Sequence, residues 1–366
     1  MSSLSVGIVG LPNVGKSTLF NALTKNAVPA ENYPFCTIDP SVGIVAVPDG
    51  RLETLSELSH SAETIPAVVE FVDIAGLVKG ASSGEGLGNK FLANIRETDM
   101  IAEVIRIFDD EDIHHVEGTV DPLTDIEIIN LELVMADAET VAKRLENLGR
   151  DVKKGDKQAI AEHALLERML PHLEAGNLAN ALKMDDEERK LIKQLHLLTM
   201  KPFLYVCNKK YGAYNFDDTN DERWQELLAF FEETDAEYVV VDAGIEQELK
   251  DLSEDEKNEF RREYGAQDSG VASLIRASYH RLGLMSYFTT GEKETRAWTV
   301  PIGSTGPQAG AAIHSDFEQK YIRAQVVTFE DLVTCGSFAK AREAGKLRTE
   351  GKEYIVQDGD VIEFLI

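Results

Sequence analysis

The sequence predicts an α/β fold with three parts: a mostly parallel β-sheet, an inserted α-helical coiled-coil hairpin and a small C-terminal α+β domain. Five apolar runs rich in β-branched residues have few polar interruptions, as strands buried on both faces of a parallel sheet do. They are residues 6–9, 68–73, 101–108, 203–207 and 238–241. Helical stretches separate these runs, which is the pattern of βαβ units. The length of 366 residues is enough for two or three domains.

An all-helical segment lies between the third and fourth runs. Its apolar residues recur at alternating spacings of three and four, which is the seam of a coiled coil: Leu131, Val134, Ala138, Val141, Leu145 and Leu148. Residues 149–157 interrupt this pattern with two glycines and a basic run, and a second apolar helical stripe continues to Leu173. We expect a two-helix hairpin with its tip at the basic run. Two ordinary helices folded onto the sheet are the alternative.

The character of the sequence changes after residue 283. Short strand-like runs at 296–300, 321–327, 354–356 and 361–364 alternate with turns. Asp358–Gly359 lies between the last two runs and is a strong short-range signal for a β-hairpin. We therefore expect a separate α+β domain at the C-terminus.

Residues 10–17 read Gly-x-x-x-x-Gly-Lys-Ser, between the first predicted strand and a helix-compatible run. This strand–loop–helix context is what a phosphate-binding loop (P-loop) requires. Its backbone N–H groups and the helix N-terminus attract phosphate, while Lys16 can neutralise the β- and γ-phosphates and Ser17 can hold Mg²⁺. The sequence thus predicts a P-loop NTPase domain in two parts, 1–125 and 203–282, around a hairpin at 126–202, with the C-terminal domain at 283–366.

A second phosphate element follows the second predicted strand, where Asp73-x-x-Gly76 begins. We expect Asp73 to hold Mg²⁺ through water and the Gly76 N–H to meet the γ-phosphate. Thr37 lies between the two phosphate elements and can offer another hydroxyl to Mg²⁺. Leu77 stands where related switch enzymes have a Gln that orients the attacking water. Since Leu cannot hydrogen-bond water, hydrolysis is expected to be slow or to recruit another group.

The fourth predicted strand leads into Asn208-Lys209-Lys210-Tyr211. A guanine-specific site would read Asn-Lys-x-Asp, with two hydrogen bonds from the guanine edge to the Asp. Hydrogen bonds to a charged group are worth roughly 1.5–3 kcal/mol each, so their loss weakens guanine binding by about a hundred- to ten-thousand-fold. The amide of Asn208 suits the N6/N7 edge of adenine. The sequence therefore favours ATP over GTP.

Composition excludes several other classes of protein. The net charge of −27 argues against non-specific DNA or RNA binding, which needs many Lys and Arg contacts with phosphate. RNA would require a local basic patch, and 150–157 and 340–352 are the two candidates. No run approaches the ~18 apolar residues of a membrane span, and no secretion signal is visible. With three widely spaced cysteines, the expectation is a cytoplasmic protein that does not bind membranes.

Motifs along almost the whole chain resemble those of the YchF subfamily of Obg-like ATPases, which are translation-factor-related P-loop proteins. They occur at residues 10–18, 32–38, 71–78, 84–92, 296–300, 314–317 and 351–361. The resemblance implies a nucleotide domain, an inserted helical hairpin and a C-terminal TGS domain of β-grasp type. It also implies hydrolysis of ATP in preference to GTP, and association with the ribosome.

The resemblance carries residue roles onto matching positions. It implies phosphate binding by Asn13, Val14, Gly15, Lys16, Ser17 and Thr18, and Mg²⁺ binding by Ser17 and Thr37. It implies adenine contacts by Asn208 and the backbone near Lys209. His115, rather than His114, aligns with a His that positions the water where Leu77 cannot. Asn13 also suggests K⁺ beside the phosphates. Three positions depart from the family: Tyr211 replaces Glu, Glu103 replaces His and Tyr321 replaces Phe.

Together these observations predict a slow Mg²⁺-dependent ATPase that acts as a conformational switch. One alternative is a nucleotide-gated ribosome- or RNA-binding module with incidental turnover, which Leu77 supports. A GTPase of the Obg-like type is another. A small-molecule kinase is the least supported, because the Asp-x-x-Gly element is present and no Arg-rich lid is evident.

Overall fold

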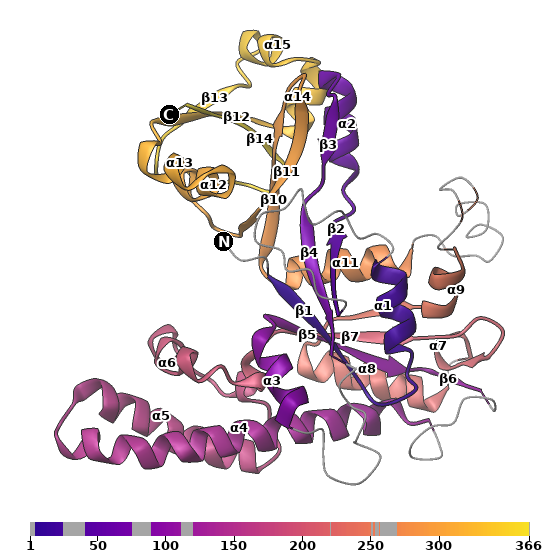
Figure 1. The fold of residues 1–366 in the computed structure, drawn as a ribbon, viewed down its shortest axis with the longest axis vertical. Helices are drawn as coiled ribbons and strands as arrows, with labels where there is room; N and C mark the ends of the chain where they lie inside the picture. Colours follow the sequence, from indigo (N-terminus) through magenta and orange to yellow (C-terminus); the bar gives the residue numbers. More distant parts are fainter. Residues whose placement is uncertain are drawn as a thin grey trace.

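The computed structural model describes most of the chain, and Figure 1 shows two sheets with a helical hairpin projecting from one of them. The described residues are 4–24, 41–74, 89–110, 120–219, 221–249 and 269–365, with the single positions 252 and 256. Within these residues, no helix has the length and hydropathy needed to cross a membrane.

The nucleotide-domain sheet has six strands in the order β2-β4-β1-β5-β7-β9. They are β1 (Ser5–Val9), β2 (Val42–Ala46), β4 (Val68–Asp73), β5 (Met100–Arg106), β7 (Phe203–Asn208) and β9 (Tyr238–Val241). All neighbours are parallel except β2 and β4. The five predicted strands are confirmed, with one correction. The third ends at Arg106, and β6 (Phe108–Asp109) pairs instead with β8 (Tyr214–Asn215) in a separate small sheet. The antiparallel edge strand β2 was not predicted.

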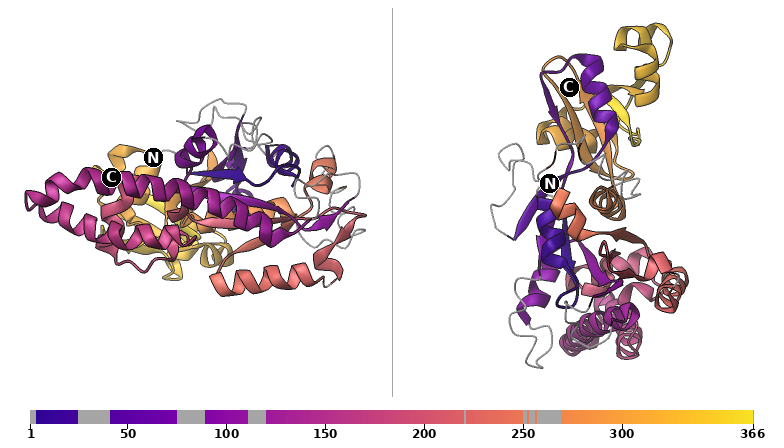
Figure 2. Two further views of the ribbon diagram at one scale, coloured as in Figure 1. Left: turned by 90° about the horizontal axis from the view of Figure 1, so that it is seen from below. Right: turned by 90° about the vertical axis from the view of Figure 1, so that its right-hand side faces the viewer.

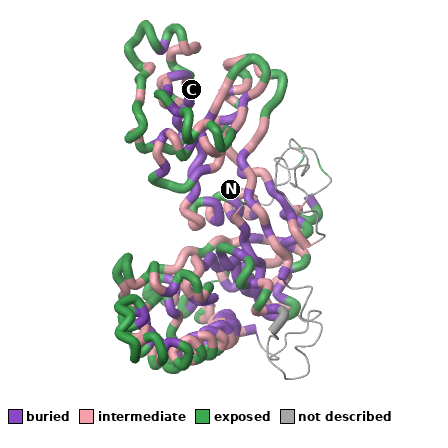
Figure 3. The backbone as a smooth tube through the Cα atoms, turned by 60° about the vertical axis from the view of Figure 1, so that its left-hand side comes forward, coloured by how far each residue is buried: buried purple, intermediate pink, exposed green. Residues whose placement is uncertain are grey.

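Helices pack on the sheet and bury its apolar side chains, and the buried segments run through its centre in Figure 3. Strands β1, β5 and β7 are buried along their whole length, which explains their uninterrupted apolar sequence. The helices of this domain are α1 (Lys16–Thr24), α3 (Asn89–Glu97), α7 (Phe216–Thr219), α8 (Glu222–Thr234), α9 (Ala243–Glu248) and α11 (Gly270–Arg281).

The inserted segment forms an antiparallel pair of long helices, α4 (Pro122–Lys153) and α5 (Lys157–Glu174), that reaches away from the sheet (Figures 1 and 2). Asp121 caps α4 by accepting hydrogen bonds from the Leu123 and Thr124 N–H groups. The predicted break at 149–157 is too wide, because α4 continues through Gly149 and the turn occupies residues 154–156.

Most of the predicted seam holds the two helices together. Val134, Val141 and Leu148 are buried against α5, whereas Leu131 is 53% exposed and lies outside the seam. Arg144 and Glu162 join the helices through paired hydrogen bonds of 2.7 and 2.8 Å, a bidentate geometry. A short helix, α6 (Asp186–Ile192), and three 3₁₀ turns, Ala179–Ala181, Lys193–Leu195 and Leu198–Met200, return the chain to β7.

The C-terminal sheet has the order β13-β12-β14-β10-β11-β3. Its C-terminal strands are β10 (Leu284–Thr290), β11 (Glu294–Pro301), β12 (Arg323–Thr328), β13 (Arg348–Glu350) and β14 (Asp360–Leu365). The helices are α12 (Gly306–Ile313), α13 (Ser315–Lys320), α14 (Phe329–Cys335) and α15 (Phe338–Glu343). The predicted hairpin at Asp358–Gly359 is wrong: residues 354–356 contain only an isolated bridge from Ile355 to Thr305, and β14 pairs with β12 and β10.

The remaining strand of this sheet comes from the N-terminal half of the chain. Between β2 and β4, the chain leaves the nucleotide-domain sheet and forms α2 (Gly50–Ser59) and β3 (Glu63–Ile65). Strand β3 pairs in parallel with β11, as Figures 1 and 2 show. The boundary at 283 stays a prediction, and the structure adds strand β3 to the C-terminal sheet and places α2 against it.

Candidate nucleotide site

The loop between β1 and α1 adopts backbone conformations that only particular residues tolerate. Gly10 has φ 145° and Gly15 has φ 101°. A Cβ atom at Gly10 would lie 2.4 Å from the Val104 carbonyl oxygen, and one at Gly15 would lie 2.2 Å from the Asn208 amide nitrogen. Asn13, with φ 64°, is in the left-handed region that Asn enters more readily than most residues. The motif therefore requires glycine at these two positions, because a side chain there would collide with neighbouring atoms.

Lys16 begins α1, and its side chain is folded into the loop with only 9% of the residue exposed. Its ammonium group donates a hydrogen bond to the Leu11 carbonyl oxygen. Burial lowers the pKa of Lys16 to about 8, although the negative charge of Asp73 opposes this shift. A cation thus lies inside the loop, where a phosphate can replace the Leu11 carbonyl as its partner. Ser17 follows at the exposed start of the helix.

Asp73 ends β4 at the same edge of the sheet as the loop. It pairs with Ile8 of β1, and its N–H donates to the Ser41 carbonyl oxygen at 2.8 Å. Because the strands are parallel, their carboxyl ends meet where the P-loop begins, and Asp73 acts electrostatically on Lys16. The hydroxyl of Ser17 and the carboxylate of Asp73 are the oxygen donors that Mg²⁺ prefers. The described donor set therefore fits magnesium.

Four of the sequence-predicted positions lie outside the described residues. They are Thr37, Gly76, Leu77 and His115. Their expected roles in holding Mg²⁺, meeting the γ-phosphate and positioning water stay predictions.

Asn208, at the end of β7, joins the loop to the rest of the sheet. Its side-chain amide donates to the Val14 carbonyl oxygen at 2.8 Å and accepts from the Ala243 N–H at 3.1 Å. The residue is buried, and both ends of its amide are used by the protein itself. The adenine contact expected of Asn208 stays a prediction. The sequence does not predict that Asn208 lies beneath the P-loop, because this position depends on how β7 and α9 pack.

The next two lysines of this motif are held by neighbouring carboxylates. The Lys209 ammonium lies 3.0 Å from Asp217 and 3.1 Å from Asp218. Burial alone would lower the pKa of Lys209, but these hydrogen bonds and charges outweigh it and raise the pKa. Lys210 pairs with Asp110. Both ammonium groups are therefore held by ion pairs with carboxylates of the chain itself.

Tyr211, where a guanine-binding site would have Asp, is 61% exposed. Its N–H donates to Asp242 at 2.6 Å, and Asp242 also caps α9 by accepting from the Ile245 N–H. Burial raises the pKa of Asp242. Sequence reasoning missed Asp242, whose position directly after a buried strand was the available signal. Its carboxylate fixes the backbone at Tyr211.

Glu103 lies at the root of the helical hairpin. This side chain on β5 is 1% exposed, pairs in register with Tyr205 of β7, and lies near Asp125 of α4. Burial, followed by the negative charge of Asp125, raises the pKa of Glu103 well above its ordinary value. A buried carboxyl group with a raised pKa therefore lies between the sheet and α4, on the strand next to β1.

Comparison with known proteins places this geometry in a family. Residues 284–366 match the C-terminal family model of YchF GTPases, described as a protein of unknown function (DUF933), and residues 5–136 match a model described as a 50S ribosome-binding GTPase. The chain is 52% identical over 362 residues to the ribosome-binding ATPase YchF of Bacillus subtilis, covering 99% of each chain. It is 48% identical over 359 residues to that of Escherichia coli, covering 98% of each.

A solved structure agrees with these relatives. The YchF GTPase of Schizosaccharomyces pombe superposes with a TM-score of 0.89 at 37% identity, and the alignment covers 100% of this chain and 98% of that one. The similarity therefore extends over the nucleotide domain, the hairpin and the C-terminal sheet together.

Proposed function

The chain belongs to the YchF family, and from this premise we propose that it is a Mg²⁺-dependent ATPase that acts as a slow conformational switch on the ribosome. The observation that carries the proposal is the meeting of Lys16 and Asp73 at the mouth of the P-loop. A buried cation and a carboxylate at the carboxyl edge of a parallel sheet form a site for a triphosphate with its metal.

Each residue of the loop has a distinct part in this proposal. The N–H groups from Asn13 to Thr18 bind the phosphates, and Lys16 neutralises the β- and γ-phosphate oxygens. Ser17 and Thr37 hold Mg²⁺, and Asp73 holds it through water. The metal, when bound, would neutralise charge that develops on the phosphates. Gly76 meets the γ-phosphate.

Two further assignments complete the site. His115 positions the attacking water, since Leu77 cannot, and K⁺ beside Asn13 would add positive charge. Lys16 is already desolvated, so its charge acts on the transferring phosphate with little screening.

The base motif supports ATP as the substrate. Tyr211 offers no carboxylate to the guanine N1–H and N2–H groups, and Asp242 uses its carboxylate on backbone N–H groups. Guanine therefore loses about 3–6 kcal/mol of binding that a conventional Asn-Lys-x-Asp site supplies. Adenine binding does not depend on those two hydrogen bonds, so it is not weakened in this way.

Ribosome binding is proposed because the relatives from Bacillus subtilis and Escherichia coli are named ribosome-binding ATPases. The projecting hairpin supports it, because its tip carries Arg150, Lys153, Lys154 and Lys157 in a chain with a net charge of −27. A local basic tip can approach RNA phosphates while the rest of the surface repels them. A ribosomal partner implies a cytoplasmic location.

A GTPase is the second candidate function. It is favoured because the N-terminal family model and the Schizosaccharomyces pombe structure are both described as GTPases.

Phosphate release by the full chain tests the function. We expect turnover with Mg·ATP, little with Mg·GTP, loss of turnover in Lys16→Met, and stimulation by ribosomes. Faster turnover with GTP would favour the GTPase. ATP-dependent ribosome binding without any stimulated turnover would favour a nucleotide-gated module.

A further inference from the structure

The two sheets share one continuous extended segment. Strand β3 ends at Ile65 in the C-terminal sheet and β4 begins at Val68 in the nucleotide-domain sheet. Only Pro66 and Ala67 separate them, and Pro66 has a fixed φ. The Ala67 carbonyl oxygen accepts from the Val47 N–H at 2.8 Å, so the link itself is held. The eight residue steps from Ile65 to Asp73 span about 26 Å. Figure 1 shows β3 and β4 end to end.

The C-terminal domain grips the far end of this segment. Residues of β3 pair with β11 at three positions, from Glu63 with Glu294 to Ile65 with Arg296. Helix α2, which precedes β3, buries Leu52 and Leu55 in the shared core, and α2 contacts β10, β11 and α14. The excursion at 50–65 is thus built into the C-terminal domain by backbone pairing and by apolar packing.

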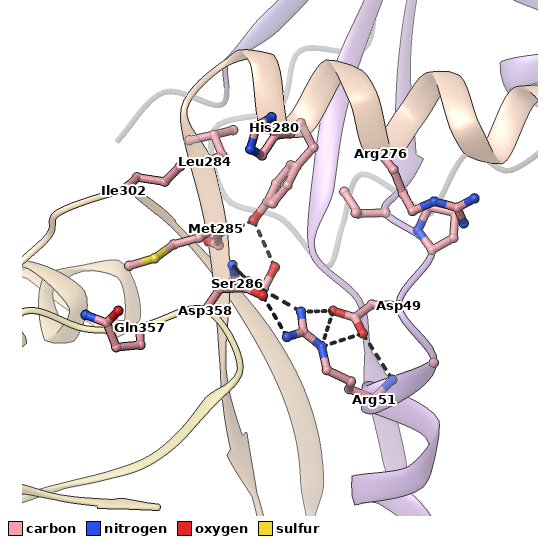
Figure 4. Close-up of a pocket in the computed structure, with 14 residues that line it drawn as sticks. Asp49, Arg51, Arg276, His280, Leu284, Met285, Ser286, Ile302, Gln357 and Asp358 are labelled. Carbon is pink, nitrogen blue, oxygen red and sulfur yellow. Dashed lines mark hydrogen bonds and ion pairs between the residues drawn. The ribbon is translucent and has the colours of Figure 1, made fainter. Parts of the chain in front are cut away.

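Arg51 latches the start of this excursion to the loop before β14. Its guanidinium lies 2.7 Å from Asp358 and 2.7 Å from Asp49 (Figure 4). It also lies 5.2 Å from the centre of the Phe288 ring. Asp358 in turn accepts from the Ser286 N–H at 3.1 Å. The hydrogen bond with Asp49 is the largest of the effects that raise the pKa of Arg51. Arg51 therefore connects the start of α2 to β10 and to the loop before β14.

Beside this latch, the junction is open. A cavity of about 650 Å³ is lined by Arg276, Tyr279 and His280 of α11 and by Ile302 and Gln357 of the C-terminal domain. Figure 4 shows Arg276 and His280 on α11, with Ile302 and Gln357 on the C-terminal side. Next to this cavity, the buried Tyr279 of α11 donates its hydroxyl to the Met285 carbonyl oxygen of β10 at 3.0 Å, so α11 also joins the two domains directly. The shared segment and its latch form a second connection, separate from α11, and this one leads to Asp73.

We propose that Arg51 is a positioning residue: by latching the excursion at 50–65 to Asp358, it makes the C-terminal domain set the position of Asp73 in the nucleotide site. Displacement of the C-terminal domain moves β3, and β3 continues into the strand that carries Asp73. By reciprocity, a metal-bound triphosphate that fixes Asp73 also fixes the C-terminal domain. The claim rests on the proposed function for its nucleotide, but the mechanical link is independent of it.

Hydrogen exchange of the nucleotide-free chain tests the link. We expect the amides of residues 69–73 to exchange about fivefold faster in Arg51→Ala and in Asp358→Asn, with 203–208 unchanged, because the anchor of β4 is loosened. Arg51→Lys, which keeps the charge, should exchange at an intermediate rate. Lys346→Ala is the matched control, since it removes a 3.2 Å ion pair with Asp331 inside the C-terminal domain.

Nucleotide binding provides the second readout. We expect Mg²⁺ to increase ATP affinity about fivefold less in the Arg51→Ala variant than in the unmodified chain. The ATP affinity measured without Mg²⁺ should change by less than about twofold. A merely structural role would shift both affinities alike. Exchange at 69–73 equal to that of the unmodified chain in Arg51→Ala and Asp358→Asn would overturn the proposal. Absence of ATP binding by the unmodified chain would overturn the proposed function instead, whatever the exchange shows.

Discussion

The side-chain amide of Asn208 donates a hydrogen bond to the Val14 carbonyl oxygen at 2.8 Å, so the base motif and the phosphate loop form one unit. Ala243 completes the unit by donating to the other end of the same amide. The P-loop conformation consequently depends on a residue 194 positions away in the sequence. This contact therefore links the Asn208 motif after β7 directly to the P-loop.

Replacing Asn208 with Ala should weaken every nucleotide by a similar factor. The change leaves the buried Ala243 N–H without its partner and frees the loop, which costs about 1–3 kcal/mol in stability and about tenfold in affinity. Competition binding with ATP, GTP and inorganic triphosphate measures the effect. A selective loss of ATP, with GTP and triphosphate unchanged, would show that the amide serves adenine instead.

Lys16→Met should abolish nucleotide binding and make the protein more stable near pH 7. The folded pKa of about 8 lies below the ordinary 10.5, so unfolding takes up protons between these values and the stability of the unmodified chain rises with pH there. The burial penalty is present in full below pH 8, and its removal is worth up to about 3 kcal/mol. Urea unfolding at pH 7 and pH 10 measures it. If Lys16→Met gained more stability over the unmodified chain at pH 10 than at pH 7, the lowered pKa of Lys16 would be contradicted.

Glu103→Gln should change how stability varies with pH. The folded pKa is raised, so the unfolded chain releases this proton at a lower pH than the folded chain does, and the burial of Glu103 becomes more costly as pH rises above about 4.5. The variant should gain stability over the unmodified chain between pH 5 and pH 8. Exposed Glu146 supplies the control substitution, Glu146→Gln. A stability difference that does not vary with pH would contradict the raised pKa of Glu103.

Asp137→Ala should loosen the hairpin without affecting the nucleotide site. The buried Asp137 carboxylate on α4 accepts from the Leu198 and Thr199 N–H groups, both at 2.8 Å, and from the Thr199 hydroxyl at 2.6 Å. Loss of the carboxylate leaves these buried donors unpaired, which lowers the free energy of unfolding by about 2–5 kcal/mol. Hydrogen exchange at 198–200 should rise strongly while ATP affinity stays within about twofold. Unchanged exchange there would contradict this role.

Local chemistry explains why the P-loop was predictable, whereas packing explains what was missed. The pattern at 10–17 determines its own backbone, because Gly10 and Gly15 are needed wherever such a loop forms. Strands β1, β5 and β7 were equally clear from their apolar runs. The excursion at 50–65 was not, since a three-residue strand, exposed in its first two residues, carries no periodic signal and owes its place to β11.

The Glu103 cluster and the partners of Asn208 show the same limit. Glu103 and Asp125 belong to different elements, β5 and α4, so only the packing of α4 on the sheet reveals that these two buried carboxyl groups lie near each other. The failed hairpin at Asp358–Gly359 has a similar cause. The turn exists, but tertiary pairing assigns β14 to β12 and β10, and Asp358 to Arg51.

Tyr211→Asp should shift the base preference toward guanine. The new carboxylate would restore the acceptor for the guanine N1–H and N2–H groups, and the Tyr211 backbone is already held by Asp242. We expect the ratio of GTP to ATP affinity to rise about tenfold or more, with Tyr211→Asn as the uncharged control. No change in this ratio would mean that position 211 does not face the base.

Direct competition of Mg·ATP against Mg·GTP for the unmodified full chain decides whether this P-loop site is an ATP site. ATP should bind about a hundredfold more tightly than GTP, and Lys16→Met should bind neither. GTP binding as tightly as ATP, or more tightly, would contradict the assignment of this chain as an ATPase.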